Sequence, residues 1–276
     1  GEETLGMELC TNRMVKINHY MNDLVSEDTE VIGRTSFEPV QFTLNKEVNP
    51  IVITTDNMQL TYDTQSGLLT VFDPTGKQLL QQQSLLGKDN MGVSFNHVPE
   101  IPLYGVSGYD AWEKSSEGML RQSGGIIEAG KQGDCGAPFI FTNRGFGLLV
   151  DTDGGLFKEQ GGILTFSGNS KVNMTYYLMV GTPMEIQSSV AQVSGTSPMF
   201  PKWAMGFTNS EWGLDQTELS AIIDTYREKQ LPIDNFTLDF DWKAWGEDNY
   251  GEFRWNDVKF PDGSSGKLQD QLLKEG

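Results

Sequence analysis

The sequence is poor in the residues that bind metals or build disulfide frameworks. It has two cysteines, Cys10 and Cys135, and two histidines, His19 and His97, each isolated from the others. Two cysteines are too few for a disulfide framework, so free thiols in a reducing compartment such as the cytoplasm are favoured. Because no Cys/His cluster occurs, we predict no zinc site. The acidic segment 151–155 lacks the distal glutamate of a calcium loop, so we expect a hairpin turn there. We expect the chain to bind neither a metal nor a cofactor.

Long apolar runs and positive charge are also scarce. No segment approaches the roughly 18 apolar residues of a membrane-spanning helix, so we expect no membrane partner. Acidic residues outnumber basic ones by 38 to 20, which gives a formal net charge of −18 at pH 7. This surplus disfavours nucleic acid and anionic membranes as partners. It is compatible with a neutral sugar, although solubility alone accounts for it. The chain begins at Gly1 rather than Met, so the lack of a leader decides nothing about export.

From Met7 to about Ser197 the hydrophobic pattern is that of an all-β region. Apolar and polar residues alternate, or short apolar runs are bounded by glycine, asparagine, aspartate and proline. We predict strands at Met14–Tyr20, Ile51–Thr55, Met58–Tyr62, Leu68–Phe72, Pro138–Thr142, Phe146–Val150 and Lys171–Val180. Turns are expected at 63–67, 73–76 and 143–145. Short strands separated by such turns predict a β-sandwich.

A different pattern begins near Pro201. Trp203–Thr208 reads as a short strand, and Asp215 with Glu218 forms a capping box at the start of a helix. Apolar residues then recur at helical spacing until about Gln230, and a second strand is predicted over Asn235–Trp242. Strand, helix and strand in this order form a βαβ unit, whose strands are parallel. We therefore place a boundary within Ser194–Phe200 and predict two domains, 1–197 and 198–276.

Four motifs in the second region keep a common order and spacing. They are PKWAMGF at 201–207, REKQLPID at 227–234, LDFDW at 238–242 and FRWNDVKFPD at 253–262. With them the chain resembles glycoside hydrolase family 31, which contains α-glucosidases, α-xylosidases and related transglycosylases. Two segments of the first region, 53–80 and 137–152, resemble the same family more loosely. The resemblance implies a mainly β chain: a β-sandwich of the galactose-mutarotase-like supersandwich type, followed by the first βαβα part of a (β/α)8 TIM barrel.

The resemblance also implies where the catalytic residues lie. Retaining hydrolysis needs two carboxyl groups that flank the scissile bond. In the family both are aspartates on later barrel strands, which by order would follow Gly276, and no segment of this chain matches the nucleophile motif. We therefore expect no catalytic residue within this chain. The resemblance implies that the chain is the N-terminal fragment of an α-glycoside hydrolase and that it is inactive alone.

Several residues are nevertheless candidates for binding an oligosaccharide. Asp239 matches the family aspartate that binds the non-reducing sugar unit, and a carboxylate can accept hydrogen bonds from vicinal hydroxyls; capping of a loop is its alternative role. Asp241 lies two residues on, so in a strand both side chains share a face. It is either a second sugar contact or the partner of a barrel arginine.

Aromatic residues and a glycine-rich loop supply the other candidates. Trp242 and Trp212 are expected to stack on sugar rings, with Trp245 and Tyr250 in the same loop as Trp242; packing of the loops is the alternative. In the family a sandwich loop contributes an aspartate to the pocket. Asp134, in the loop 130–138, is the candidate, with Asp110 as a second choice and a plain turn acid as the alternative.

A second class of function competes with the enzyme. The sandwich alone would suffice for a non-catalytic carbohydrate-binding or scaffold module. A binding module, however, has no need of the start of a barrel, so the run from Pro201 to Asp262 favours the hydrolase. Two parallel barrel strands without neighbours leave an edge and an apolar face bare. We expect this region to pack on the sandwich, to self-associate with another copy, or to be followed by further chain.

Overall fold

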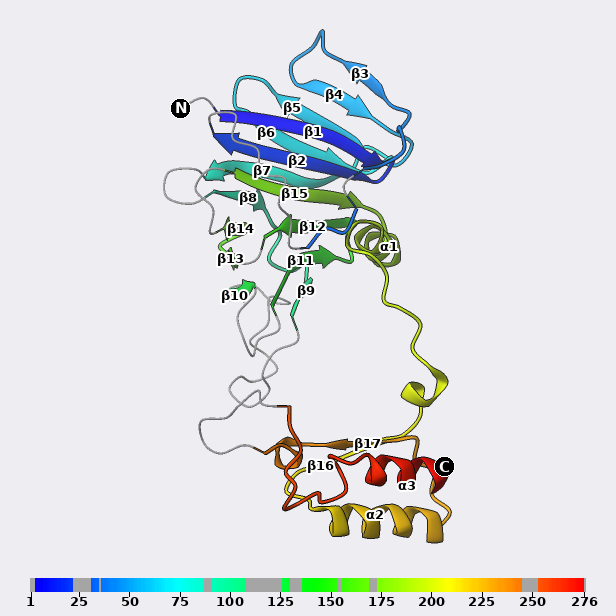
Figure 1. Ribbon diagram of the computed structural model, residues 1–276. Helices are drawn as coiled ribbons and strands as arrows, with labels where there is room; N and C mark the ends of the chain where they lie inside the picture. Colours follow the sequence, from blue (N-terminus) through cyan, green and yellow to red (C-terminus); the bar gives the residue numbers. More distant parts are fainter. Residues whose placement is uncertain are drawn as a thin grey trace. The chain divides into compact units, whose positions relative to one another are not determined.

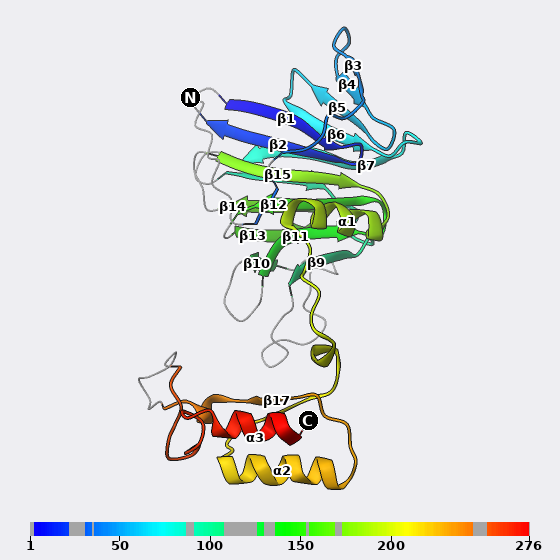
Figure 2. The same ribbon diagram turned by 45° about the vertical axis from the view of Figure 1, so that its right-hand side comes forward.

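The computed structural model describes residues 3–21, 31–34, 36–86, 91–107, 126–129, 136–152, 155–168, 173–244 and 253–275. The chain divides into two compact units, Gly1–Thr196 and Ser197–Gly276 (Figures 1 and 2). The first unit is built almost entirely of strands, and the second mixes short strands with helices. The prediction of a mainly β chain is confirmed.

Two antiparallel sheets make up the first unit (Figure 1). The six-stranded sheet has the order β1-β2-β15-β12-β11-β9, with bounds Glu3–Thr11, Met14–Met21, Asn173–Val180, Phe146–Asp151, Gly136–Thr142 and Leu103–Ser107. The nine-stranded sheet has the order β10-β13-β14-β8-β7-β6-β5-β4-β3, with bounds Ile126–Ala129, Gly155–Gln160, Ile163–Gly168, Gly92–Asn96, Gln78–Leu86, Leu68–Phe72, Gln59–Asp63, Ile51–Thr54 and Thr43–Asn45.

Every strand predicted in this unit coincides with an observed one to within two residues at each described end. The turns between them also form as expected. Asp63 Oδ1 accepts hydrogen bonds from the N–H groups of Gln65 and Ser66, and Gly67 closes the turn with a φ of 72° that favours glycine. Turn and strand signals are local in sequence, which is why the pattern of residues sufficed to locate them.

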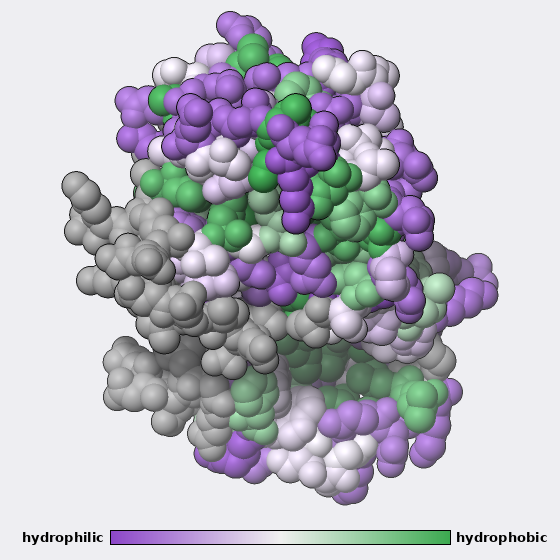
Figure 3. All heavy atoms as spheres, turned by 90° about the horizontal axis from the view of Figure 1, so that it is seen from above, coloured by the Kyte–Doolittle hydropathy of each residue, from purple (hydrophilic) through white to green (hydrophobic). Residues whose placement is uncertain are grey.

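The main hydrophobic core is shared by the two sheets. Strands of both sheets contribute the alternate residues that point inward, such as Leu69 and Val71 from β6 or Tyr176 and Leu178 from β15. On the face drawn in Figure 3, hydrophilic and hydrophobic residues are interspersed, as is usual for a surface in water.

The all-β prediction for Met7–Ser197 was wrong at its end, because helix α1 spans Pro183–Ser194. Thr182 caps this helix, and Glu185 completes a capping box, so a local helix signal was present. The buried residues of α1 are only Ile186, Ser189 and Val193, a stripe too short to give a clear helical period in the sequence.

Helix α1 packs on the outer face of the six-stranded sheet. A second hydrophobic cluster joins Ile186 and Val193 of α1 to Tyr177 and Met179 of β15. The contact is close at Gly147 of β12, where an added Cβ would lie 2.5 Å from Cγ2 of Ile186. Strand β15 is therefore buried on both faces, which explains its nearly continuous apolar sequence.

The carboxylate of Glu185 ties α1 to the sheet. Its Oε2 accepts hydrogen bonds from the backbone N–H (2.8 Å) and hydroxyl (2.9 Å) of Thr182, and Arg13 lies 2.7 Å from Oε1. The backbone hydrogen bond from Thr182, foremost among these contacts, lowers the pKa of Glu185 below its ordinary value of 4.5. A carboxyl group with a depressed folded-state pKa stabilises the fold above its unfolded-state pKa. That contribution is lost as the pH falls through the folded-state pKa.

We therefore expect the urea midpoint of the first unit to depend less on pH in Glu185→Gln than in the parent protein. The difference should develop below about pH 5, where the unfolded chain begins to take up protons. Equilibrium unfolding between pH 7 and pH 3 measures it. Glu38→Gln, at an exposed carboxylate outside any helix, should keep the parental profile. Identical profiles for Glu185→Gln and the parent would contradict this account.

The second unit begins with a βαβ arrangement. Strand β16 (Thr208–Glu211) pairs in parallel with β17 (Asn235–Leu238), and helix α2 (Gln216–Glu228) connects them. The predicted capping box of Asp215 and Glu218 is present, and the helix ends at Lys229. The predicted βαβ unit and its parallel strands are confirmed. Helix α3 (Lys267–Glu275) follows later in the chain.

Strand β17 begins at Asn235 as predicted, but the predicted end of β17 and the predicted bounds of the first strand were wrong. The apolar run before β16 forms a 3₁₀ helix, η1 (Lys202–Met205), between Pro201 and Gly206, because φ at proline is fixed and local i→i+3 bonds close the turn. Strand β17 ends at Leu238, and a second 3₁₀ helix, η2 (Phe240–Trp242), follows it.

The core of the second unit is small. Leu219 and Ile223 of α2 pack with Phe260 and Leu268, and partly buried residues of β17 and the aromatic loop surround them. Many large apolar side chains are exposed in this unit, namely Met199, Phe200, Trp203, Met205, Phe207, Trp212, Leu231, Phe240, Phe253, Val258 and Leu273. A parallel sheet is normally covered on both faces, so this unit presents surfaces suited to further packing.

Candidate functional site

The parallel pairing of β16 and β17 brings two predicted site residues to one end of the sheet. Glu211 is paired with Leu238, so Trp212 and Asp239 leave their strands at the same, carboxyl, end. The N–H of Asp239 donates to the carbonyl of Glu211 over 3.2 Å, which fixes the two strand ends together. Residues at the carboxyl ends of parallel strands are where α/β folds assemble their sites.

Asp239 is exposed at this end and is held by its own backbone turn. It is the N-cap of η2, and its Oδ1 accepts a hydrogen bond of 2.7 Å from the N–H of Phe240. Within the described part of the chain, no cation forms an ion pair with its carboxylate. The carboxylate therefore keeps acceptor positions for an incoming hydroxyl group.

Asp241 is placed differently from what a strand would give. Because Asp241 lies in the 3₁₀ helix η2, the expectation that it shares a strand face with Asp239 was wrong. Its Oδ1 lies 2.8 Å from Nζ of Lys259, and both side chains are half-buried. Asp241 was expected either to make a second contact with the sugar or to pair with a barrel arginine. Its contact corresponds to the pairing role, with Lys259 in place of the arginine. Lys259 was not singled out from the sequence, although it lies in the motif at 253–262.

The two tryptophans of the site differ in exposure. Trp242 is half-buried and packs against Trp255, with ring centroids 5.1 Å apart at 65°, and against Phe253 at 6.3 Å. Trp212 is 72% exposed, so a large part of its indole faces solvent. An exposed indole can stack on a sugar ring, whereas Trp242 mainly supports the loop behind it.

The motif at 253–262 forms a scaffold under the site. Asn256 donates its N–H to the carbonyl of Trp242 over 2.8 Å. The side chains of Gln216 and Asp262 tie the motif to α2, since Nε2 of Gln216 donates to Oδ2 of Asp262 (2.8 Å) and Oε1 accepts from its N–H (2.9 Å). Phe260 is buried beneath them. The positions of η2 and of the first turn of α2 therefore depend on the same loop.

The remaining predicted residues are placed as follows. Asp134, Asp110, Trp245, Tyr250 and Cys135 lie outside the described residues. Cys10 is buried in the cluster beneath α1, where burial raises the pKa of its thiol to about 12, so it stays protonated at neutral pH. A protonated, buried thiol is a poor nucleophile.

The described residues offer neither a metal site nor a membrane-spanning helix. Among them, no group of three or more histidine, cysteine, aspartate or glutamate residues is arranged to hold a metal ion. No helix in the same part of the chain has the length and apolar character needed to cross a membrane.

Comparison with known proteins places this geometry in a family. Residues 197–276 match the family described as the "Glycosyl hydrolases family 31 TIM-barrel domain". The whole chain is 35% identical to a 1,6-alpha-glucosyltransferase of Sporosarcina globispora, of which it covers 22%. Residues 197–276 thus carry the TIM-barrel domain of glycoside hydrolase family 31. The family resemblance drawn from the four motifs is thereby confirmed.

Solved structures of family 31 show the same fold. An alpha-xylosidase from a soil metagenome, complexed with xylose, superposes with a TM-score of 0.83 at 20% identity, over 99% of this chain and 44% of that one. A Flavobacterium johnsoniae dextranase mutant complexed with isomaltotriose gives a TM-score of 0.78 at 17% identity, over 98% and 37%. The chain thus spans about a fifth of its curated relative and under half of these solved chains.

Proposed function

We propose that this chain is the N-terminal part of a retaining α-glycoside hydrolase or transglycosylase that acts on α-linked oligosaccharides. The observation that carries the proposal is the placement of Asp239 and Trp212 directly after the carboxyl ends of the paired strands β16 and β17, inside the region that matches the family 31 barrel. One relative is named a 1,6-alpha-glucosyltransferase, and a similar dextranase structure contains isomaltotriose. Both names favour α-linked glucose as the sugar.

In this proposal each residue of the site has a binding role. The Asp239 carboxylate accepts hydrogen bonds from two hydroxyls of the non-reducing sugar unit, because an ionised carboxylate offers two acceptor oxygens. Trp212 covers the apolar face of a sugar ring. Asp241, paired with Lys259, holds η2 in place and thereby positions Asp239. These residues bind and orient the substrate but do not break the bond.

The two catalytic carboxyl groups are assigned to chain outside residues 1–276. A retaining enzyme needs one carboxylate as nucleophile and one as acid/base, about 5 Å apart across the glycosidic bond. Further barrel strands would supply both groups and would also cover the exposed apolar residues of the second unit. The chain by itself is accordingly inactive.

An assay of two proteins tests the proposal. Residues 1–276 and a longer protein that completes the barrel would be compared on p-nitrophenyl α-glucoside, p-nitrophenyl α-xyloside and isomaltotriose. We expect turnover by the longer protein alone, with release of the α-anomer as seen by ¹H NMR. Turnover by residues 1–276 would move catalysis to carboxylates of this chain. Inactivity of both proteins would favour the non-catalytic binding module.

A further inference from the structure

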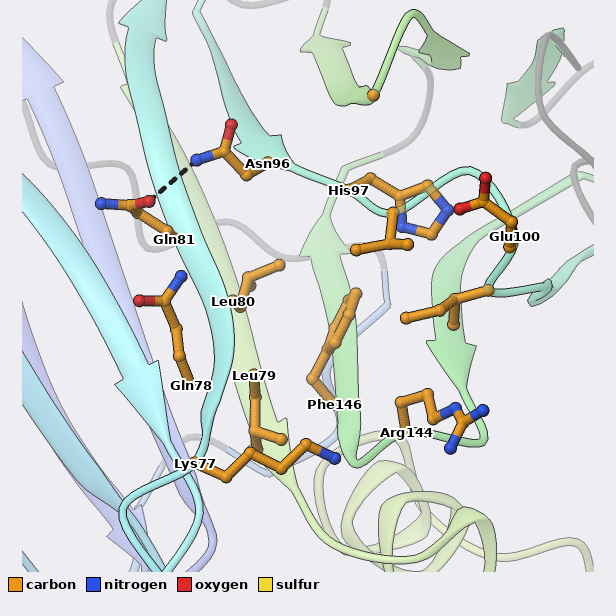
Figure 4. A pocket seen from close by; sticks show the side chains of 13 residues that line it. Lys77, Gln78, Leu79, Leu80, Gln81, Asn96, His97, Glu100, Arg144 and Phe146 are labelled. Atoms are coloured by element: carbon orange, nitrogen blue, oxygen red, sulfur yellow. Dashed lines mark hydrogen bonds between the residues drawn. The ribbon is translucent and has the colours of Figure 1, made fainter.

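A cleft in the sandwich unit has no part in the site described above. It has a volume of about 710 Å³ and lies between β7 and β8 of the nine-stranded sheet and the β11–β12 turn of the six-stranded sheet (Figure 4). Volumes of this order are typical of small-molecule sites. All of its lining residues belong to the first unit.

The lining combines an apolar floor with polar walls. Leu80 and Phe146 are buried core residues that reach the floor. Figure 4 shows His97 and Glu100 at one end of the cleft, Lys77 and Arg144 at the other end, and Phe146 between them. An apolar surface flanked by a few convergent polar groups is the usual construction of a ligand site.

The side chain of Asn96 and the backbone at His97 are held by their neighbours. The Nδ2 of Asn96 donates to Oε1 of Gln81 over 2.9 Å, and its Oδ1 accepts from Gln83. The backbone N–H of His97 donates to the carbonyl of Gly162 over 2.8 Å, and an added Cβ on Gly162 would lie 3.2 Å from the His97 carbonyl. This wall is therefore ordered before any ligand arrives, which lowers the entropic cost of binding.

The cleft carries charges of both signs, while the net charge of the whole chain disfavours an anionic ligand. Burial lowers the pKa of His97 below its ordinary value, against the opposing effect of the Glu159 and Glu100 carboxylates, so its imidazole is neutral at pH 7. The negative charge of Glu100 then offsets part of the positive charge of Lys77 and Arg144. The other polar side chains of the wall are uncharged amides. A net charge of −18 on the chain also opposes anions.

We propose that this cleft is a second carbohydrate site, in which the sandwich binds a neutral oligosaccharide of α-linked glucose. Carboxylate, guanidinium and carboxamide groups together offer both acceptors and donors, as the hydroxyl groups of a sugar require. The exposed side chain of Val98 and the half-buried side chains of Leu79 and Ile101 offer apolar surface to the face of a ring. The choice of glucose rests on the proposed function, whereas the site itself rests on the cleft.

Binding of isomaltotriose to residues 1–276 tests the proposal. Calorimetry gives the Kd, and ¹H–¹⁵N spectra locate the contacts. We expect shifts at residues of β7, β8 and the β11–β12 turn, and a Kd raised about tenfold or more by Glu100→Gln and by Arg144→Gln, because each removes a charged hydrogen-bonding group. Both side chains are exposed, so neither change should disturb folding.

Matched controls separate the two sites. Glu47→Gln, at an exposed carboxylate away from the cleft, and Asp239→Asn should both leave the sandwich shifts and their Kd unchanged. The proposal would be overturned if isomaltotriose caused no spectral shifts at sandwich residues, or if those shifts were lost in Asp239→Asn. It would also be overturned if inorganic phosphate, but not the sugar, caused them. Sandwich binding combined with an inactive longer protein would instead reject the proposed function alone.

Discussion

Replacement of Phe260 by alanine is expected to unfold the region after Ser197 while the sandwich stays folded. Phe260 is 1% exposed and is one of few fully buried residues in the small core of the second unit. Its ring lies 5.6 Å from that of Trp255. Truncation of a buried phenylalanine costs about 3–5 kcal/mol, which is comparable to the whole stability expected of so small a core.

Tryptophan fluorescence can follow this loss selectively. Of the six tryptophans in the chain, only Trp112 precedes Ser197, so the emission reports mainly on the second unit. Far-UV circular dichroism of the strands reports mainly on the first. Val258→Ala is the matched control, because Val258 lies in the same loop but is 93% exposed. We expect it to change stability by less than about 0.5 kcal/mol. Equal effects of the two substitutions would show that the Phe260 core does not hold the unit together.

Asp239→Asn in the longer protein is expected to lower kcat/KM about ten- to a hundredfold. The change removes the charge from hydrogen bonds to the sugar, and hydrogen bonds to charged groups contribute about 1.5–3 kcal/mol. Asparagine is as good an N-cap as aspartate, so the contact with the N–H of Phe240 and the turn at η2 should survive. The loss would then reflect binding of the substrate rather than folding.

Steady-state kinetics on p-nitrophenyl α-glucoside measure this effect. Asp224→Asn is the control, since it makes the same chemical change on an exposed position of α2. It should leave kcat/KM within twofold of the parent value. If Asp239→Asn were equally harmless, Asp239 would have no role in substrate binding, and its function would be that of a cap for η2.

Residues close in sequence accounted for most of what could be predicted. The cap of α2 by Asp215 and Glu218, the turn at Asp63 and the strand at Leu68–Phe72 each depend on neighbours a few residues away. Apart from helix α1, the differences from the prediction concern apolar runs that were predicted as strands. The run at Trp203–Met205 is instead a 3₁₀ helix with much of its apolar surface exposed, because Pro201 and Gly206 bound it.

The sequence by itself determined the resemblance to family 31 and the two kinds of fold, because hydrophobic period, caps and turns are encoded locally. The tertiary structure alone decided which residues meet. It paired Asp241 with Lys259, left Asp239 without an ion pair among the described residues, and brought Lys77, His97 and Arg144 around one cleft. These contacts join segments that are distant in the chain, and only the packing of sheets and helices sets their distances.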